Sequence, residues 1–207
     1  MHTVSVIMNL CDRRHWIFDM DGTLTQPVHD FESIRQTLGI PGSTPILEYI
    51  STLPTEDAQR IRRELDEIEM DLAAEAVAQP GASDLLRLLL DLNMQVGILT
   101  RNGEEIAHAT LDACGLRHFF YDDVIVGRET CLPKPMPDGV VYLMNHWSAD
   151  PTDTVMVGDY LYDIEAGRRA GVATVHYSAS GTYPWPEFTD FGVSSIAELL
   201  AFFDSYR

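Results

Sequence analysis

The chain has 207 residues, of which 45% are hydrophobic and 22% are charged. These proportions are typical of a folded protein, and the length accommodates one domain or one domain with a modest insertion. Acidic residues outnumber basic residues by 32 to 14, which gives a formal net charge of −18. Such a surface repels nucleic acid and anionic membranes, so we expect neither as a partner. An anionic substrate would need a site with its own cations.

Neither a membrane span nor an export signal is expected. No stretch approaches the roughly 20 apolar residues that a membrane span needs. The N-terminus has no basic region ahead of its apolar residues and no clear cleavage site. The three cysteines, Cys11, Cys114 and Cys131, are an odd number without a C-x-x-C spacing, which argues against a disulfide framework. These features predict a cytoplasmic protein.

The first part of the chain predicts one strand followed by helices. The first ten residues fit either a short edge strand or a loose arm. Residues 14–20 fit a buried central strand because they contain an apolar, β-favouring run. A long helix is expected to begin after Pro54, with Thr55 as its N-cap. Two shorter helices are expected before it, over residues 30–38 and 44–52.

The long helix has one apolar face. Four residues at spacings of four, three and four form that face: Ile61, Leu65, Ile68 and Leu72. Charged residues occupy the other positions: Arg62, Arg63, Asp66, Glu67 and Glu69. We expect the apolar face to pack on neighbouring elements, although its heptad-like spacing also suits a dimer seam. The sequence therefore leaves the oligomeric state open.

After a break at Gln79-Pro80-Gly81, strands alternate with helices. This alternation predicts an α/β fold, a doubly wound parallel sheet covered on both faces, with ligands beyond the carboxyl ends of its strands. Strands are expected over residues 95–100, 123–126, 154–157 and 172–176. Helices are expected over residues 82–92, 103–114, 137–147, 161–170 and 195–203.

Candidate catalytic and ligand-binding residues follow four of the expected strands. Asp19 and Asp21 end the first strand, and two carboxylates there suit the binding of a hard cation such as Mg²⁺ while one attacks phosphorus. The remaining candidates follow the second, third and fourth strands of the expected sheet: Thr100, Arg101 and Asn102, then Lys134, then Asp159 and Asp163. All of them are expected at one edge of the sheet.

This order of a D-x-D-G-T turn, a strand-end threonine, a loop lysine and a G-D-x-x-x-D turn resembles the signature of the haloacid dehalogenase-like hydrolase superfamily. The resemblance spans about residues 14–176. It implies a Rossmann-like core made of residues 1–25 and 81–207. It also implies a small α-helical cap, residues 26–80, of the kind found in the phosphoglycolate phosphatase-like branch. We call these residues the cap segment.

The resemblance also implies roles for individual residues. Asp19 would be the nucleophile that forms an aspartyl-phosphate, and Asp21 the general acid and base. Four residues would bind the phosphoryl group: Thr100, Arg101, Asn102 and Lys134. Mg²⁺ would be held by Asp19, Asp159 and the backbone carbonyl of Asp21. Asp163 would orient a metal-bound water or Lys134, and Gly22 and Thr23 would support the first turn.

By this resemblance, the acid at position 21 implies a phosphatase that acts on a small phosphorylated metabolite. A phosphoglycolate-like acid, a sugar phosphate and a nucleoside monophosphate all remain open as substrates. A related phosphomutase is the alternative, and a non-catalytic domain that binds a phosphorylated ligand is a further one. Arg101 stands where many relatives have asparagine, and it either faces the substrate or points to solvent. The clustered cap arginines, Arg60, Arg62 and Arg63, either bind an anionic substrate or form solvent-facing ion pairs with Glu56, Asp66 and Glu67.

Overall fold

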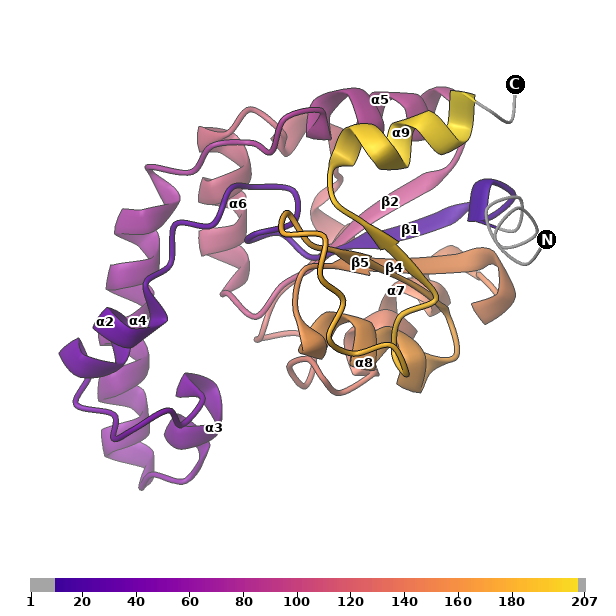
Figure 1. Cartoon of the computed structure of the whole chain (residues 1–207). Coiled ribbons are helices and arrows are strands. Elements are labelled where there is room, and N and C mark those ends of the chain that lie inside the picture. Colours follow the sequence, from indigo (N-terminus) through magenta and orange to yellow (C-terminus); the bar gives the residue numbers. More distant parts are fainter. Residues whose placement is uncertain (1–9, 205–207) are drawn as a thin grey trace.

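The structure is a computed structural model, and it describes residues 10–204. The expectation of an edge strand or arm at the N-terminus concerns residues that lie almost entirely outside this range. Within it, no helix is long and apolar enough to cross a bilayer. Figure 1 shows a twisted sheet covered by helices and, at one side, a separate group of helices.

The sheet has six parallel strands in the order β3-β2-β1-β4-β5-β6. These strands span His15–Phe18 (β1), Gln95–Leu99 (β2), Ile125–Val126 (β3), Thr154–Gly158 (β4), Ala173–Tyr177 (β5) and Phe191–Val193 (β6). The helices of this part are Ala82–Asp91 (α5), Glu104–Ala113 (α6), Asp138–Trp147 (α7), Leu161–Ala170 (α8) and Ile196–Asp204 (α9). In Figure 1, α5 and α9 cover one face of the sheet while α7 and α8 cover the other. The predicted doubly wound α/β fold is confirmed.

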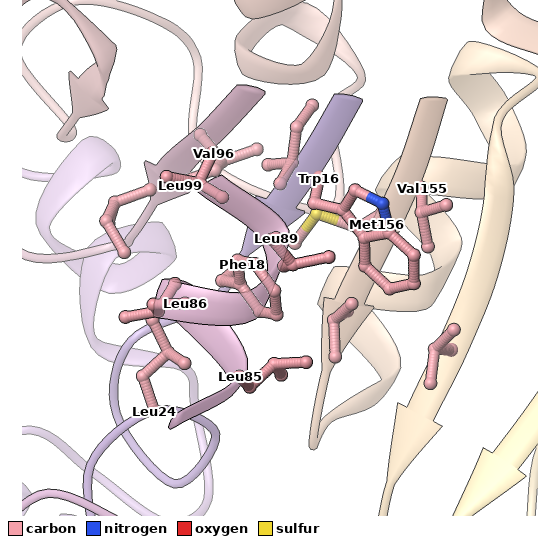
Figure 2. Close-up of a cluster of buried hydrophobic side chains, with 14 of the residues drawn as sticks. Trp16, Phe18, Leu24, Leu85, Leu86, Leu89, Val96, Leu99, Val155 and Met156 are labelled. Atoms are coloured by element: carbon pink, nitrogen blue, oxygen red, sulfur yellow. The ribbon is translucent and has the colours of Figure 1, made fainter. Parts of the chain in front are cut away.

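The core is built around β1, the strand that precedes the D-x-D-G-T turn. Trp16, Ile17 and Phe18 are each fully buried, because β2 and β4 flank the strand and helices cover both faces. Trp16 and Phe18 point to the same face, as period-two alternation requires. Figure 2 shows them packed beside the leucines of α5. The rigid strand therefore fixes the position of the residues that follow it.

The expected elements differ from the structure at three points. The three-residue strand β6 was not expected, since its short sequence Phe191-Gly192-Val193 carries no clear strand pattern. The strand β3 has only two residues, because a 3₁₀ turn occupies Asp122–Val124. Thr55 is the first helical residue rather than the N-cap, which is Pro54 and makes no side-chain capping bond.

The cap segment contains the helices Phe31–Thr37 (α2), Ile46–Ser51 (α3) and Thr55–Ala73 (α4). It has its own hydrophobic cluster, which includes the buried residues Ile61 and Leu65 with Ile68 and Leu72 packed against them. The predicted apolar face of α4 is thus confirmed. Glu69 is an exception to the predicted charged faces, because it is buried.

The two ends of the cap segment pair with each other. The backbone N–H of Gln26 donates to the Val77 carbonyl at 2.8 Å, and the backbone N–H of Gln79 donates to the Leu24 carbonyl at 2.8 Å. These bonds bring the entry and the exit of the cap segment side by side at the end of β1. The division into a core and a cap at residues 26 and 80 remains a prediction that this arrangement supports.

The packing on β1 generates a stability prediction. Leu86→Ala is expected to lower the free energy of unfolding by about 2–5 kcal/mol, because the Leu86 side chain is fully buried. Leu90 lies one turn later on α5 and is 40% exposed, so Leu90→Ala serves as the matched control with an expected cost of about 1 kcal/mol or less. Urea unfolding of both variants measures the difference. Equal losses would contradict the described packing.

Candidate active site

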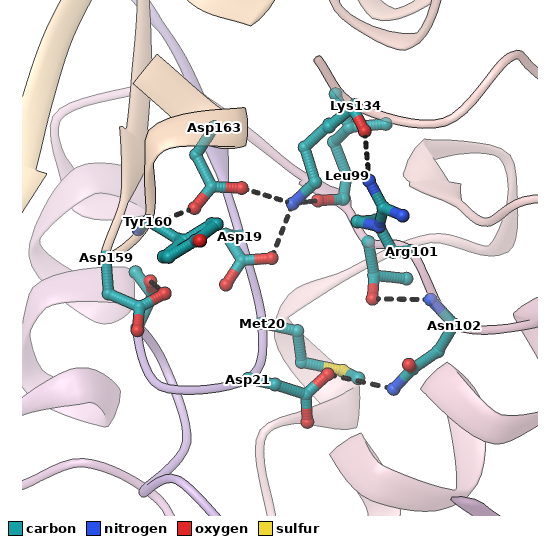
Figure 3. Close-up of polar contacts among 12 residues, drawn as sticks. Asp19, Met20, Asp21, Leu99, Arg101, Asn102, Lys134, Asp159, Tyr160 and Asp163 are labelled. Atoms are coloured by element: carbon teal, nitrogen blue, oxygen red, sulfur yellow. Dashed lines mark hydrogen bonds and ion pairs between the residues drawn. The ribbon is translucent and has the colours of Figure 1, made fainter. Parts of the chain in front are cut away.

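The carboxyl ends of the central strands surround a cavity of about 350 Å³. The Asp19 amide donates to the Val157 carbonyl at 2.8 Å, which continues the sheet for one residue beyond β1. Eight predicted site residues line the cavity: Asp19, Asp21, Thr100, Arg101, Asn102, Lys134, Asp159 and Asp163. Figure 3 shows Asp19 and Asp163 pointing toward Lys134. The strand-end residues singled out in the sequence therefore lie together in space.

Lys134 lies at the centre of the site and its side chain is 1% exposed. Its Nζ atom is 2.5 Å from Asp19 Oδ1, 2.6 Å from Asp163 Oδ1 and 2.6 Å from the carbonyl oxygen of Leu99 (Figure 3). Burial alone would lower the pKa of Lys134, but the carboxylates of Asp163 and Asp19 raise it above its usual value. Lys134 therefore stays charged and holds Asp19 in place.

The carboxylates around Lys134 carry more negative charge than one ammonium group neutralises. Burial raises the pKa of Asp19, and the charges of Asp163, Asp159 and Asp21 raise it further against the opposing effect of Lys134. Burial and the charge of Asp163 raise the pKa of Asp159 from 3.8 to about 7. The site therefore favours a further cation near these groups.

Three of these carboxylates fit a divalent cation. Asp19, Asp159 and Asp163 each offer one oxygen atom, and these atoms lie within 4.8 Å of one another. Oxygen atoms of this kind are the ligands that Mg²⁺ prefers. The Asp21 side chain does not belong to this group, so any part of Asp21 in metal binding would fall to its backbone carbonyl, as the resemblance implies.

Gly22 and Thr23 hold the first turn against Asp159. Gly22 has a φ of +86°, and a Cβ atom at that position would lie 2.4 Å from Asp159 Oδ2. Only glycine fits there, because both the backbone conformation and the space exclude a side chain. The buried Thr23 hydroxyl donates to Asp159 Oδ1 at 3.5 Å. Both residues therefore lie against Asp159, and their supporting role remains a prediction.

Asp21 has surroundings of its own, apart from the cluster at Lys134. Asn102 Nδ2 donates to Asp21 Oδ2 at 2.8 Å (Figure 3), and His29 Nδ1 lies 3.8 Å from Asp21 Oδ1. Burial raises the pKa of Asp21, although His29, Lys134 and Asn102 oppose this effect. A carboxyl group with a raised pKa is suited to donate a proton. Asp19 and Asp21 thus have different environments, as their different predicted roles require.

Thr100 and Asn102 are linked to each other. The backbone N–H of Asn102 donates to Thr100 Oγ1 at 3.1 Å, and both residues are buried. The side chain of Asn102, which the sequence placed among the phosphate ligands, is instead bound to Asp21. Its contact positions the general acid candidate, while phosphate binding by Thr100 remains a prediction.

Arg101 was predicted either to face the substrate or to point to solvent. In the structure it lines the cavity, but its guanidinium is bound to a carboxylate. Its Nη2 atom donates to both carboxylate oxygens of Glu48 on α3, at 2.9 and 2.8 Å, and its Nη1 atom donates to the Lys134 carbonyl at 2.5 Å. The guanidinium also lies 4.7 Å from the ring centroid of Tyr162. Arg101 lines the cavity, but its charge is matched by a carboxylate of the cap segment.

The clustered cap arginines lie outside the cavity. Arg60, Arg62 and Arg63 are exposed, which agrees with the solvent-facing interpretation. The partners of Arg60 differ from those predicted, because it pairs with Asp57 and Glu64. The cavity wall includes a different arginine of the cap segment, Arg35, which no pattern in the sequence singled out.

A buried ion cluster between the core and α4 was also missed. Arg128, two residues after β3, binds Asp66 and lies 2.9 Å from Glu69 Oε2. The Arg128 side chain is 2% exposed and that of Glu69 is 9% exposed. Burial raises the pKa of Glu69 from 4.5 to about 7, against the opposing effect of Arg128. Arg128 follows a strand, and this position could have marked it as a candidate site residue. No feature of the sequence predicted that Glu69 is buried.

Comparisons with known proteins agree with this geometry. The family model described as haloacid dehalogenase-like hydrolase matches residues 14–171. The chain belongs to the haloacid dehalogenase-like hydrolase family. An uncharacterized hydrolase of Saccharomyces cerevisiae is 30% identical over 191 residues, which cover 89% of this chain and 88% of the relative.

Two further similarities concern a relative with a named activity and a solved structure. A phosphoglycolate phosphatase of Chromobacterium violaceum is 28% identical over 218 residues, which cover 93% of this chain and 97% of the relative. A crystal structure of a hydrolase from Pseudomonas syringae superposes with a TM-score of 0.77 at 24% identity, covering 93% of this chain and 99% of the other. The structural match shows the shared fold of this haloacid dehalogenase-like hydrolase.

The buried Glu69 generates a pH prediction. An acid whose pKa is higher in the folded protein binds protons more tightly there, so the free energy of unfolding falls as pH rises from about 4.5 to about 7. The shift corresponds to a loss on the order of 3 kcal/mol. Glu69→Gln is expected to remove this part of the pH dependence.

Urea unfolding between pH 4 and 8 in the presence of a chelator measures this effect. Glu67→Gln is the matched control, because Glu67 is exposed on the same helix. The control is expected to keep the full slope of the wild-type protein. A Glu69→Gln variant with the wild-type slope would show that Glu69 ionises normally in the folded state.

Proposed function

We propose that the protein is a Mg²⁺-dependent phosphatase that hydrolyses a small phosphorylated metabolite through an aspartyl-phosphate. The observation that carries this proposal is the pair of aspartates at the end of β1. Asp19 is fixed by the Lys134 ammonium, while Asp21 has a raised pKa, accepts a hydrogen bond from Asn102 and lies 3.8 Å from His29 Nδ1. The similarity to a phosphoglycolate phosphatase supports phosphate ester chemistry.

In the first half of the reaction, a carboxylate oxygen of Asp19 attacks the phosphorus atom of the substrate. The bond from phosphorus to the ester oxygen breaks, and Asp21 donates its proton to the departing oxygen. The Lys134 ammonium lies against Asp19 Oδ1 at 2.5 Å. It orients that oxygen and favours the ionised form of Asp19 against burial and the neighbouring carboxylates, and it offsets charge on the phosphoryl group.

In the second half, Asp21 is a carboxylate and acts as a general base. It accepts a proton from a water molecule while the water oxygen attacks the phosphorus atom of the aspartyl-phosphate. The bond between phosphorus and Asp19 breaks, which releases inorganic phosphate and restores the Asp19 carboxylate. Asn102 holds the Asp21 side chain through its 2.8 Å bond in both halves. The buried Thr100 would bind phosphoryl oxygens together with neighbouring backbone N–H groups.

Asp19, Asp159 and Asp163 would hold Mg²⁺, and the ion would supply positive charge against the phosphoryl oxygens. A phosphate dianion without this charge would meet several carboxylates at short range. Each such pair at about 4 Å costs on the order of 4 kcal/mol at an effective dielectric constant of 20. The cap segment would exclude water from the cavity and contact the leaving group.

The nucleophile is tested by Asp19→Asn. This variant is expected to reduce phosphate release by about 10³-fold or more, because the amide does not attack phosphorus. Phosphate release is measured on a panel of phosphorylated metabolites with Mg²⁺ and with a chelator, and Asp91→Asn, at an exposed position of α5, is the control. Metal-independent release, or full activity of Asp19→Asn, would contradict the proposal. Isomer formation without phosphate release would point to a phosphomutase.

The general acid is tested by Asp21→Asn with two kinds of leaving group. The kcat/KM value reports the steps up to formation of the aspartyl-phosphate. It is expected to fall much more for an alkyl phosphate than for p-nitrophenyl phosphate, because p-nitrophenolate leaves without protonation. Phosphoenzyme is expected to accumulate in this variant, since water then lacks its base. Equal losses of kcat/KM for both substrates would exclude proton donation by Asp21.

A further inference from the structure

We infer that His29 and Arg35, both from the cap segment, form a subsite for an anionic oxygen group on the leaving group of the substrate. That group is a carboxylate or a second phosphate. The inference rests on the proposed phosphatase function and names the class of ester that the site selects. Both residues line the same cavity as Asp19 and Asp21.

The first argument is the charge that remains available in the cavity. Lys134 is matched by Asp19 and Asp163, and Arg101 is matched by both oxygens of Glu48. Arg35 has a weaker partner, since its Nη2 atom lies 2.8 Å from Glu32, whose side chain is 64% exposed. Solvent screens such a pair, which contributes about 0–1 kcal/mol. Arg35 is therefore the arginine of the cavity wall whose charge is least neutralised within the described residues.

The second argument is a pair of nitrogen atoms without hydrogen-bond partners. Arg35 Nε and His29 Nε2 are both buried and neither has a partner within the described residues. The His29 side chain is 7% exposed. A buried polar atom without a partner costs about 1–3 kcal/mol, so such atoms are rare unless a ligand or water completes them. Arg35 Nε is a donor, and His29 Nε2 is a donor whenever it carries a ring proton, so oxygen acceptors of one ligand group suit both nitrogen atoms.

The third argument is the position of this pair relative to the chemistry. His29 Nδ1 lies 3.8 Å from Asp21 Oδ1, and Asp21 is the proposed donor to the leaving oxygen. The His29 ring therefore lies on the leaving-group side of the phosphorus atom. Phe31 stacks on His29 with a centroid distance of 5.4 Å and precedes Arg35 by one turn of α2. His29, two residues before α2, and Arg35, on α2, thus belong to the same wall of the cavity.

The cavity also limits the size of the substrate. Its volume of about 350 Å³ is at the lower end of the range for small-molecule sites. The cap segment adds apolar side chains from α3, Ile46 and Leu47, beside the two polar residues. These features favour a short carbon chain with the phosphate ester at one end and the anionic group at the other.

The experiment compares matched substrates that differ in one group. One pair is 2-phosphoglycolate and 2-hydroxyethyl phosphate, which differ by a carboxylate. The other is propane-1,3-diol bisphosphate and 3-hydroxypropyl phosphate, which differ by a second phosphate. The wild-type protein is expected to favour the anionic member of at least one pair by tenfold or more in kcat/KM. The pair with the larger ratio identifies the anion.

Arg35→Gln is expected to lower kcat/KM for that anionic member by about 10- to 100-fold, mainly through KM. The neutral member is expected to change little. Arg60→Gln is the matched control, because Arg60 also pairs with carboxylates of its own helix in the cap segment but lies outside the cavity. Its substrate ratio is expected to equal that of the wild-type protein.

His29→Phe is the second variant, and it keeps a ring beside Phe31 while it removes both nitrogen atoms. Any effect of this change on Asp21 acts on both members of a pair, so it cancels in their ratio. The ratio is expected to fall. Urea unfolding reports that both variants are folded, and activity towards p-nitrophenyl phosphate compares their chemical step with that of the wild-type protein.

Two results separate failure of this inference from failure of the proposed function. Equal activity of the wild-type protein on both members of each pair, or a ratio unchanged in Arg35→Gln and His29→Phe, would overturn the subsite and leave the phosphatase proposal intact. Absence of phosphate release from every substrate in the presence of Mg²⁺, including p-nitrophenyl phosphate, would overturn the proposed function itself.

Discussion

One buried ammonium group holds the site together. Lys134 contacts Asp19 and Asp163, and it also donates to the carbonyl of Leu99 at the end of β2. These partners come from the end of β1, from α8 and from β2, so one cation joins elements that are far apart in the sequence. Removal of such a cation leaves buried carboxylates uncompensated, which is strongly unfavourable. The geometry of the strand ends and the position of the Lys134 loop therefore depend on each other.

The same cation does not neutralise the whole cavity. Burial and neighbouring charges raise the pKa values of Asp159 and Glu69 to about 7, and those of Asp19 and Asp21 are also raised. An added cation is therefore favoured by the protein, whereas an added anion is opposed. In the proposed function, a divalent cation and a phosphate ester would each make the binding of the other more favourable. This balance would let a chain with a net charge of −18 accommodate a phosphate ester.

The sequence predicted the site as far as the carboxyl ends of the strands determine it. Asp19, Thr100 and Asp159 follow buried strands directly, and parallel strands bring such residues to one edge. Lys134 was also placed after the third expected strand, but its role came from the family resemblance, because a longer loop separates it from β3. His29, Arg35 and Glu69 were missed, because their place depends on how the cap segment lies on the core. No periodicity within α2 or α4 specifies that contact, which is set by tertiary packing.

Two arginines of the core form ion pairs with the cap segment, and the two pairs differ in their exposure to water. Arg128 is 2% exposed and binds Asp66 together with the buried Glu69 of α4, whereas Arg101 is 21% exposed and binds Glu48 of α3, which is 43% exposed. Water and salt screen the exposed pair more strongly than the buried one. Separation from the core therefore costs less at α3 than at α4. Because α3 also lines the cavity, the contact between core and cap segment that is more exposed to water lies beside the site.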